Sequence, residues 1–255
     1  MIGMRSGKRT DDGVTGVDAE VRAARREGLG VVLATSAYGI SFGALAVASG
    51  FDVWQTCVLS LVMFTGGSQF AFVGVIGAGG LAAVPAAIAS AALLGVRNVA
   101  YGIRMSPVIG RGVLRRAAAA QFTIDESTAV ALAQTSPRAR TAGFWITGIG
   151  IYIGWNISTL LGALLGDVLG DPKAYGLDAA AAAAFLALLW PRIRKRQAIA
   201  VGIAAAAVAT VLTPVLIPGL PVLVAALVAV LVGWFDWFGS RGGGDAGHPA
   251  EGVAA

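Results

Sequence analysis

The sequence predicts an all-α polytopic membrane protein of about six to seven helices, some of them short or broken. Apolar residues make up 56% of the 255 positions, and charged residues make up only 13%. Charge-free apolar runs close to the about 20 residues that a helix needs to cross a bilayer recur along the chain. Basic residues gather in short clusters beside these runs, which is typical of topology signals rather than of a nucleic-acid-binding face. The lipid bilayer is therefore the expected surroundings, and no nucleic-acid partner is expected.

The composition divides the chain into three regions. Residues 1–28 mix charged residues and glycine with few large apolar groups, which predicts a disordered arm. Residues 29–238 contain the apolar runs and are predicted to form the membrane domain. The glycine-rich residues 239–255 are predicted to be a disordered tail.

Apolar runs give the expected order of the membrane elements. Full spans are predicted at about 29–49, 53–72, 142–165, 176–190, 198–212 and 220–238. The segment 81–96 is short for a crossing and follows a glycine-rich stretch, so it is predicted to be broken or re-entrant. The polar residues 104–140 are predicted to form the largest internal loop, which includes a helix-like stretch.

Arginine and lysine near span ends predict which ends face the cytoplasm. The loop from Arg111 to Arg140 and the basic cluster at 192–196 both fit the cytoplasmic side of a bacterial plasma membrane. With two crossings between such clusters, the C-terminus is expected inside. The N-terminal arm lies on the same side only if the segment 81–96 does not cross fully.

Glycine pairs four residues apart recur inside the predicted spans, at Gly39 and Gly43, Gly150 and Gly154, and Gly162 and Gly166. Such pairs let helix backbones approach closely in lipid, where hydrophobic association is absent. Tight packing within the bundle is the first interpretation, and a foreign helix is the second. Residues 42–45 also echo residues 161–164, which would fit an inverted repeat.

The segment Phe64 to Phe70 places two glycines beside polar side chains inside an apolar run. Glycine allows the backbone to unwind, and Gly67, Ser68 and Gln69 would then offer backbone and side-chain groups to a zwitterionic substrate. The alternative is an ordinary helix contact, with Ser68 bonded to the preceding turn.

A second candidate segment ends the short apolar run at 81–96 and contains Arg97, Asn98 and Tyr101. An arginine at the bilayer centre costs about 2.5 to 3.5 kcal/mol on insertion scales, so it is normally paired or lines water. Arg97 could bind a substrate carboxylate with two parallel hydrogen bonds. The alternative is an interfacial arginine that only fixes topology.

The adjacent acids Asp125 and Glu126 lie in a moderately apolar stretch. Neighbouring residues on a helix point in different directions, so at most one of the two is expected to face a cavity. A carboxylate that exchanges protons would suit gradient-coupled transport, whereas a solvated helix would need the same residues for solubility.

Missing motifs exclude several classes of function. The chain has no phosphate-binding Gly-x-x-x-x-Gly-Lys-Ser/Thr loop, and its single histidine, His248, lies in the tail. The single cysteine, Cys57, lies in an apolar run without a CxxC motif. No catalytic set, metal site or cofactor site is therefore expected, and an intramembrane enzyme is the least favoured class.

The motifs taken together resemble the AzlC family, the BrnF-type large subunit of branched-chain amino acid exporters. The resemblance extends over about residues 29–238 and rests on the following positions in order: Gly39, Phe42-Gly43, Gly67-Ser68-Gln69-Phe70, Arg97, Tyr101-Gly102, Asp125-Glu126, Trp155, Leu161-Gly162 and Phe185 to Leu189. The chain departs from the family's Asn-x-Arg-His pattern, because Gly95 and Asn98 flank Arg97.

This resemblance implies export of leucine, isoleucine or valine, and often methionine, together with a small membrane subunit of the AzlD type. From the residues themselves, the candidate substrate-binding set is Gly67, Ser68, Gln69, Arg97, Asn98 and Tyr101, and the candidate proton-exchanging group is Asp125 or Glu126. A secondary carrier is the first interpretation. The alternative is a membrane permease or scaffold subunit that needs a separate energising protein.

Overall fold

The computed structural model describes residues 8–169, 196–216 and 220–235, together with positions 186, 190 and 193. The predicted span at 176–190 and the tail at 239–255 lie outside these residues apart from two isolated positions. The chain divides into one unit of Met1–Ala187 with Ile217–Gly219 and a second of Leu188–Leu216 with Leu220–Ala255. All regular secondary structure in the described residues is helical, as the sequence predicts for an all-α polytopic membrane protein.

The first unit contains α1 (Lys8–Ala48), α2 (Val53–Val62), α3 (Gly66–Gly79), the 3-10 turn η1 (Gly80–Ala83), α4 (Val84–Ile109), α5 (Val113–Phe122), α6 (Asp125–Ala133) and α7 (Pro137–Leu169). The second unit contains α9 (Arg196–Leu212) and α10 (Leu220–Phe235), which pack on each other. The helices α9 and α10 coincide with the spans predicted at 198–212 and 220–238.

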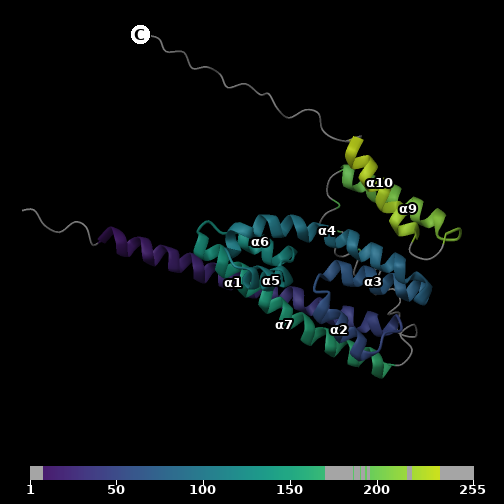
Figure 1. The fold of residues 1–255 in the computed structure, drawn as a ribbon, viewed down its shortest axis with the longest axis horizontal. Helices are drawn as coiled ribbons and strands as arrows, with labels where there is room; N and C mark the ends of the chain where they lie inside the picture. Colours follow the sequence, from purple (N-terminus) through teal and green to yellow (C-terminus); the bar gives the residue numbers. More distant parts are fainter. Residues whose placement is uncertain are drawn as a thin grey trace, which may run out of the picture. The chain divides into compact units, whose positions relative to one another are not determined.

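The long helices α1 and α7 lie side by side and run in the same direction (Figure 1). Gly28, in the middle of α1, lies against Thr147 in the first half of α7. Near their ends, Ala44 lies against Gly166. The contacts therefore advance together along the two helices, and α1 and α7 form the parallel scaffold on which the rest of the unit packs.

The glycine pairs lie at this interface, which confirms the first interpretation of their spacing. A Cβ added to Gly39 would lie 2.7 Å from the Trp155 carbonyl oxygen, and one added to Gly43 would lie 2.6 Å from the Ala163 nitrogen. Both distances are too short for a real side chain, so the helix backbones are in direct contact. The similar residues 42–45 and 161–164 both lie at this contact. Because α1 and α7 are parallel, this similarity does not come from an inverted repeat.

The helices α2 and α3 form a hairpin rather than a crossing. It begins four residues after Ser49, at Val53, and returns to the same level, because Gly77 of α3 lies against Ser49. The rings of Phe51 and Phe72 also lie 6.2 Å apart. The hairpin therefore enters from the end of the scaffold where α1 finishes, and it turns at residues 63–65.

The helix α4 runs back along the unit in the direction opposite to α1. At its start Ala87 packs with Ile76 of α3, and at its end the Val108 carbonyl accepts a hydrogen bond of 3.3 Å from Thr141. Its 26 residues span about 39 Å at 1.5 Å per residue, which is enough to cross a bilayer. The apolar stretch Gly66–Ile109 thus includes only one crossing, made by α4.

A second hairpin, formed by α5 and α6, enters from the opposite end of the scaffold. It begins just after α4 ends, and it returns to the start of α7, where Arg140 donates to the Gln134 carbonyl at 2.8 Å. Its turn at residues 123–124 lies further along α7, because Phe122 packs against Gly148. The two hairpins therefore approach each other from opposite ends.

The arrangement contains an inverted repeat. Helix α1 followed by the α2–α3 hairpin matches helix α4 followed by the α5–α6 hairpin, with opposite directions. Each long helix ends at a glycine with positive φ, Gly50 at 92° and Gly110 at 85°, a conformation that residues with a Cβ rarely adopt. A Phe-Thr pair lies at the turn of each hairpin. Phe64-Thr65 lies within the first turn, and in Phe122-Thr123 the threonine begins the second turn.

Several boundaries differ from the sequence prediction. Residues 8–28, predicted as a disordered arm, belong to α1, and Ala24 is fully buried. Residues 53–72 do not form a crossing, and residues 81–96 are not the re-entrant element, because they belong mostly to α4. Residues 104–140, predicted as a loop, contain the end of α4 and the α5–α6 hairpin.

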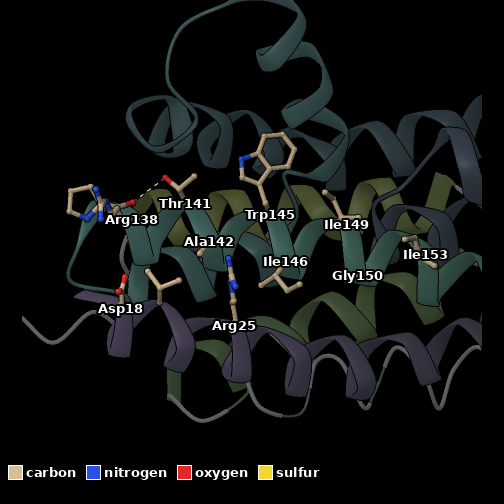
Figure 2. Close-up of a pocket in the computed structure, with 12 residues that line it drawn as sticks. Asp18, Arg25, Arg138, Thr141, Ala142, Trp145, Ile146, Ile149, Gly150 and Ile153 are labelled. Atoms are coloured by element: carbon tan, nitrogen blue, oxygen red, sulfur yellow. Dashed lines mark hydrogen bonds between the residues drawn. The ribbon is translucent and has the colours of Figure 1, made fainter. Parts of the chain in front are cut away.

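These corrections change the number of crossings from which the topology is predicted. Between the N-terminal half of α1 and the Arg111–Arg140 region the chain crosses twice, through α1 and α4, because the α2–α3 hairpin returns to its own side. Arg25 of α1 and Arg138 of α7 accordingly lie at the same end of the scaffold (Figure 2). The positive-inside rule then predicts that this end faces the cytoplasm.

The close contact between α1 and α7 predicts different outcomes for two glycine substitutions in α1. Gly43→Ala should destabilise the protein by about 1 to 3 kcal/mol, because the added methyl group overpacks the interface. Gly30→Ala is the matched control, because no atom lies within 4 Å of the added Cβ and alanine raises helix propensity. Thermal unfolding of the purified protein measures both changes. Equal stability of the two variants would contradict the packing described.

Candidate functional site

The tips of the two hairpins meet beside the middle of α7. The Leu61 carbonyl, at the end of α2, accepts hydrogen bonds of 3.0 Å from Gln121 Nε2 and 3.3 Å from the Tyr152 hydroxyl. The Tyr152 ring lies 5.0 Å from the Phe64 ring and 5.5 Å from the Phe122 ring. The Leu61 carbonyl, at the turn of the α2–α3 hairpin, is thus satisfied by Gln121 of the α5–α6 hairpin. The aromatic rings lie between the tips of the two hairpins.

The first turn of helix α3 lies at this junction. Thr65 precedes the helix but does not cap it, because its hydroxyl donates instead to Ser68 Oγ at 3.0 Å. The guanidinium of Arg97 lies against Gly67: a Cβ at that position would be 3.3 Å and 3.5 Å from its two terminal nitrogens. Gly67 therefore allows Arg97 of α4 to reach the N-terminal end of α3.

Arg97 also reaches the beginning of α6. Its Nε donates a hydrogen bond of 3.0 Å to Asp125 Oδ1 and forms a salt bridge with it. Asp125 and Glu126 both lie in the first turn of α6, where the helix dipole favours negative charge. Ser127 Oγ accepts a hydrogen bond of 3.1 Å from the Ile124 N–H, which fixes the turn just before Asp125. Arg97 therefore connects the starts of both inner helices.

The salt bridge is only partly buried. The side chains of Arg97 and Asp125 are 31% and 25% exposed. Ion pairs with this degree of solvent access contribute little to stability, typically about 0 to 1 kcal/mol. A ligand that carries both a carboxylate and an ammonium group could compete for both residues. Its carboxylate could take the place of Asp125 beside Arg97, and its ammonium group could take the place of Arg97 beside Asp125. The arrangement is therefore suited to binding a zwitterion.

Gln69 lies apart from this pair, although it is close in sequence to Gly67. It is fully buried, and its Nε2 donates to the Ser60 carbonyl at 3.5 Å. Ser60 Oγ in turn donates to Thr159 Oγ1 of α7 at 3.3 Å. Among the described residues, Gln69 Oε1 and Trp155 Nε1 are buried without a hydrogen-bond partner. Gln69, Ser60 and Thr159 thus form a chain of buried polar groups that links α3, α2 and α7.

The remaining predicted site residues occupy α4 and α6. Ser68 is 1% exposed and lies near the backbone of α4, because a Cβ at Gly95 would be 3.9 Å from its hydroxyl. Asn98 follows Arg97 directly, and its Oδ1 is buried without a partner among the described residues. Tyr101 lies one helical turn beyond Arg97, and Glu126 is partly buried. The structure thus brings Gly67, Arg97 and Asp125 together, whereas Gln69 lies apart from them.

Sequence reasoning missed the residues that join the tips, Gln121 and Tyr152. The usable signal was the Phe-Thr pair, which occurs at both Phe64-Thr65 and Phe122-Thr123. In the described parts of the chain, no group of three or more histidine, cysteine or acidic side chains could hold a metal ion.

Comparison with known proteins gives one match. A family model described as AzlC protein matches residues 30–169. No curated protein and no solved structure matches the chain. The matched range begins inside α1 and ends with α7, so it includes both hairpins and every predicted site residue.

The partial exposure of the salt bridge predicts a small coupling energy between its two residues. In a double-mutant cycle of Arg97→Gln and Asp125→Asn, the interaction term in the free energy of unfolding should stay below about 1 kcal/mol. Denaturation of the purified protein in detergent measures all four forms. A coupling well above that value would contradict the conclusion that water reaches the pair.

Proposed function

This chain belongs to the AzlC family, whose function is related to membrane transport, and from that premise we propose that it exports neutral aliphatic amino acids across the bacterial plasma membrane. The expected substrates are leucine, isoleucine and valine, with methionine as a further candidate. The observation that carries the proposal is the position of the Arg97–Asp125 pair between the starts of α3 and α6.

Both charged ends of an amino acid have a partner at this position. The substrate carboxylate would bind the Arg97 guanidinium and the first backbone N–H groups of α3, at Gly66 and Gly67. A helix N-terminus attracts anions because its first N–H groups have no partner within the helix and because the helix dipole is positive there. The substrate ammonium would bind the Asp125 carboxylate. The resident salt bridge opens as the substrate forms both contacts, so no charge is left unpaired.

The surroundings favour an apolar substrate side chain. Phe64 and Ile124, which flank the two inner helix starts, belong to the same buried apolar cluster as Trp155 and Phe70. Burying a hydroxyl or amide without a hydrogen bond costs about 1 to 3 kcal/mol, whereas burying aliphatic carbon is favourable. This difference supports selection of branched aliphatic side chains over polar ones of similar size.

Two opposed hairpins also suit alternating access. Carriers with inverted repeats bind substrate where broken helices meet, and they expose that site first to one side and then to the other. Here the tips lie beside Tyr152, halfway along the Pro137–Val168 span. Displacing the α5–α6 hairpin would open the site toward the ends where α1 and α7 begin, and displacing the α2–α3 hairpin would open it toward the other side.

The energy for export is proposed to come from the electrochemical gradient, with Asp125 or Glu126 as the proton-exchanging group. One elementary charge moving through 100 mV releases about 2.3 kcal/mol, which is enough to concentrate a substrate several tens-fold. Of the two acids, Asp125 forms the salt bridge with Arg97, and a proton and the substrate ammonium would compete for its carboxylate, as the exchange of an entering proton for a leaving substrate requires. Substrate binding and proton binding would then be linked through a single side chain.

A small membrane subunit of the AzlD type is proposed as the partner, on the basis of the family resemblance. The glycine pairs are occupied by the α1–α7 contact, so the partner must dock on another surface. Transport assays are therefore best performed on the chain co-expressed with that subunit.

Leucine transport in proteoliposomes tests the proposed site. Arg97→Gln should reduce leucine exchange by about 10- to 100-fold, because it removes a charged hydrogen bond. The matched control is Arg104→Gln, which removes an exposed arginine two turns further along the same helix. Asp125→Asn should abolish accumulation driven by an imposed pH difference, and Glu126→Gln should retain it. Normal uphill transport by the Arg97 and Asp125 variants at normal membrane abundance would refute the proposal.

A further inference from the structure

A groove of about 980 Å³ lies between α1 and α7, away from the Arg97–Asp125 pair (Figure 2). One end of the groove is charged and is formed by Asp18 and Arg25 of α1 and by Arg138 at the start of α7. Arg25 extends from α1 toward α7, and Arg138 lies at the same end (Figure 2). Two guanidinium groups and one carboxylate thus leave this end with an excess of positive charge.

The rest of the groove is apolar and follows α7 toward its middle. Trp145 lies next to the charged end, followed by Ile146, Ile149 and Ile153. Ile149 and Ile153 are 40% and 55% exposed, so the helices packed around α7 in the first unit leave this part of the wall open. Gly150 lies between them in the sequence and also lines the groove, and its missing side chain lets Val32 of α1 pack directly against α7. A charged end, an indole and an aliphatic wall therefore follow one another along a single helix.

We propose that this groove binds one anionic phospholipid, with its phosphodiester between Arg25 and Arg138 and an acyl chain along Ile146, Ile149 and Ile153. Guanidinium groups bind phosphate oxygens through parallel hydrogen bonds, and basic pockets between membrane helices bind anionic head groups. Tryptophan is enriched at head-group level, and the position of Trp145 fits that depth. The net positive charge favours an anionic lipid, because in a zwitterionic head group the phosphate charge is already balanced.

A bound lipid at this place would hold the starts of α1 and α7 together. The groove is lined by both helices and runs beside their close contacts, with Gly28 against Thr147. A phosphodiester bound by both Arg25 and Arg138 would connect α1 with α7 and balance positive charge at this end. The lipid is thus expected to stabilise this end of the scaffold, and this role does not depend on which solute is transported.

Native mass spectrometry of the full chain, titrated with phosphatidylglycerol, phosphatidylethanolamine or phosphatidylcholine, tests the proposal. The wild type should retain phosphatidylglycerol in preference to the other two. Each basic residue near a membrane surface contributes about 1 kcal/mol, so the double substitution Arg25→Gln and Arg138→Gln should weaken retention about 25-fold. The matched control is Arg22→Gln with Arg115→Gln, which removes the same charge from exposed positions outside the groove and should leave retention unchanged.

Two further measurements make the outcome unambiguous. Thermal unfolding of both double variants without added lipid shows whether they are folded, and Arg25→Lys with Arg138→Lys should restore part of the retention. A photo-reactive residue at Ile153 in native membranes should yield a phospholipid adduct. Equal retention of all three lipids, equal loss in both double variants, or an adduct with a protein subunit in place of a lipid would overturn the proposal.

Discussion

A chain that turns back within hydrocarbon exposes backbone groups that water cannot reach, and each of those groups must find a partner inside the protein. Both hairpins face this constraint, and they meet it together: Gln121 of the second hairpin and Tyr152 of α7 donate to the Leu61 carbonyl of the first. The breaks in the helices are therefore tolerated only because the tips lie against each other and against α7. The position of every other functional group in the first unit follows from this junction.

The junction also explains how an arginine can lie halfway along a membrane helix. Arg97 would be costly alone in lipid, but it lies between Asp125 and the bare start of α3 at Gly67. The start of α3 leaves room for the guanidinium and also offers N–H groups to an anion. The start of α6 stabilises Asp125 and holds it at hydrogen-bond distance from Arg97. In the proposed account, the groups that partner Arg97 in this structure are also the groups that would bind the ligand, and the partial exposure of the pair would let a ligand compete for them.

The sequence predicts the composition of this site better than its geometry. Apolar runs and glycine spacing are local signals, and they correctly predicted the all-α membrane class and close helix packing at Gly39 and Gly43, although not which helix packs there. Whether an apolar run crosses the membrane or turns back depends on contacts far apart in sequence, such as Gln121 with Leu61. For that reason residues 53–72 read as a span and residues 104–140 as a loop. A Phe-Thr pair lies at each turn, but a match of two residues is too short to predict a turn without knowing that the two hairpins oppose each other.

The central claim is that Arg97 binds the substrate carboxylate and Asp125 binds the substrate ammonium. Competition of leucine, leucinamide and 4-methylpentanoate for leucine transport tests it directly, because each analogue lacks one charged group. The wild type should prefer leucine over both analogues. Arg97→Gln should remove the preference over leucinamide and keep that over 4-methylpentanoate, and Asp125→Asn should do the reverse. If both preferences survive in both variants, the two charged ends of the substrate are recognised elsewhere and the account is wrong.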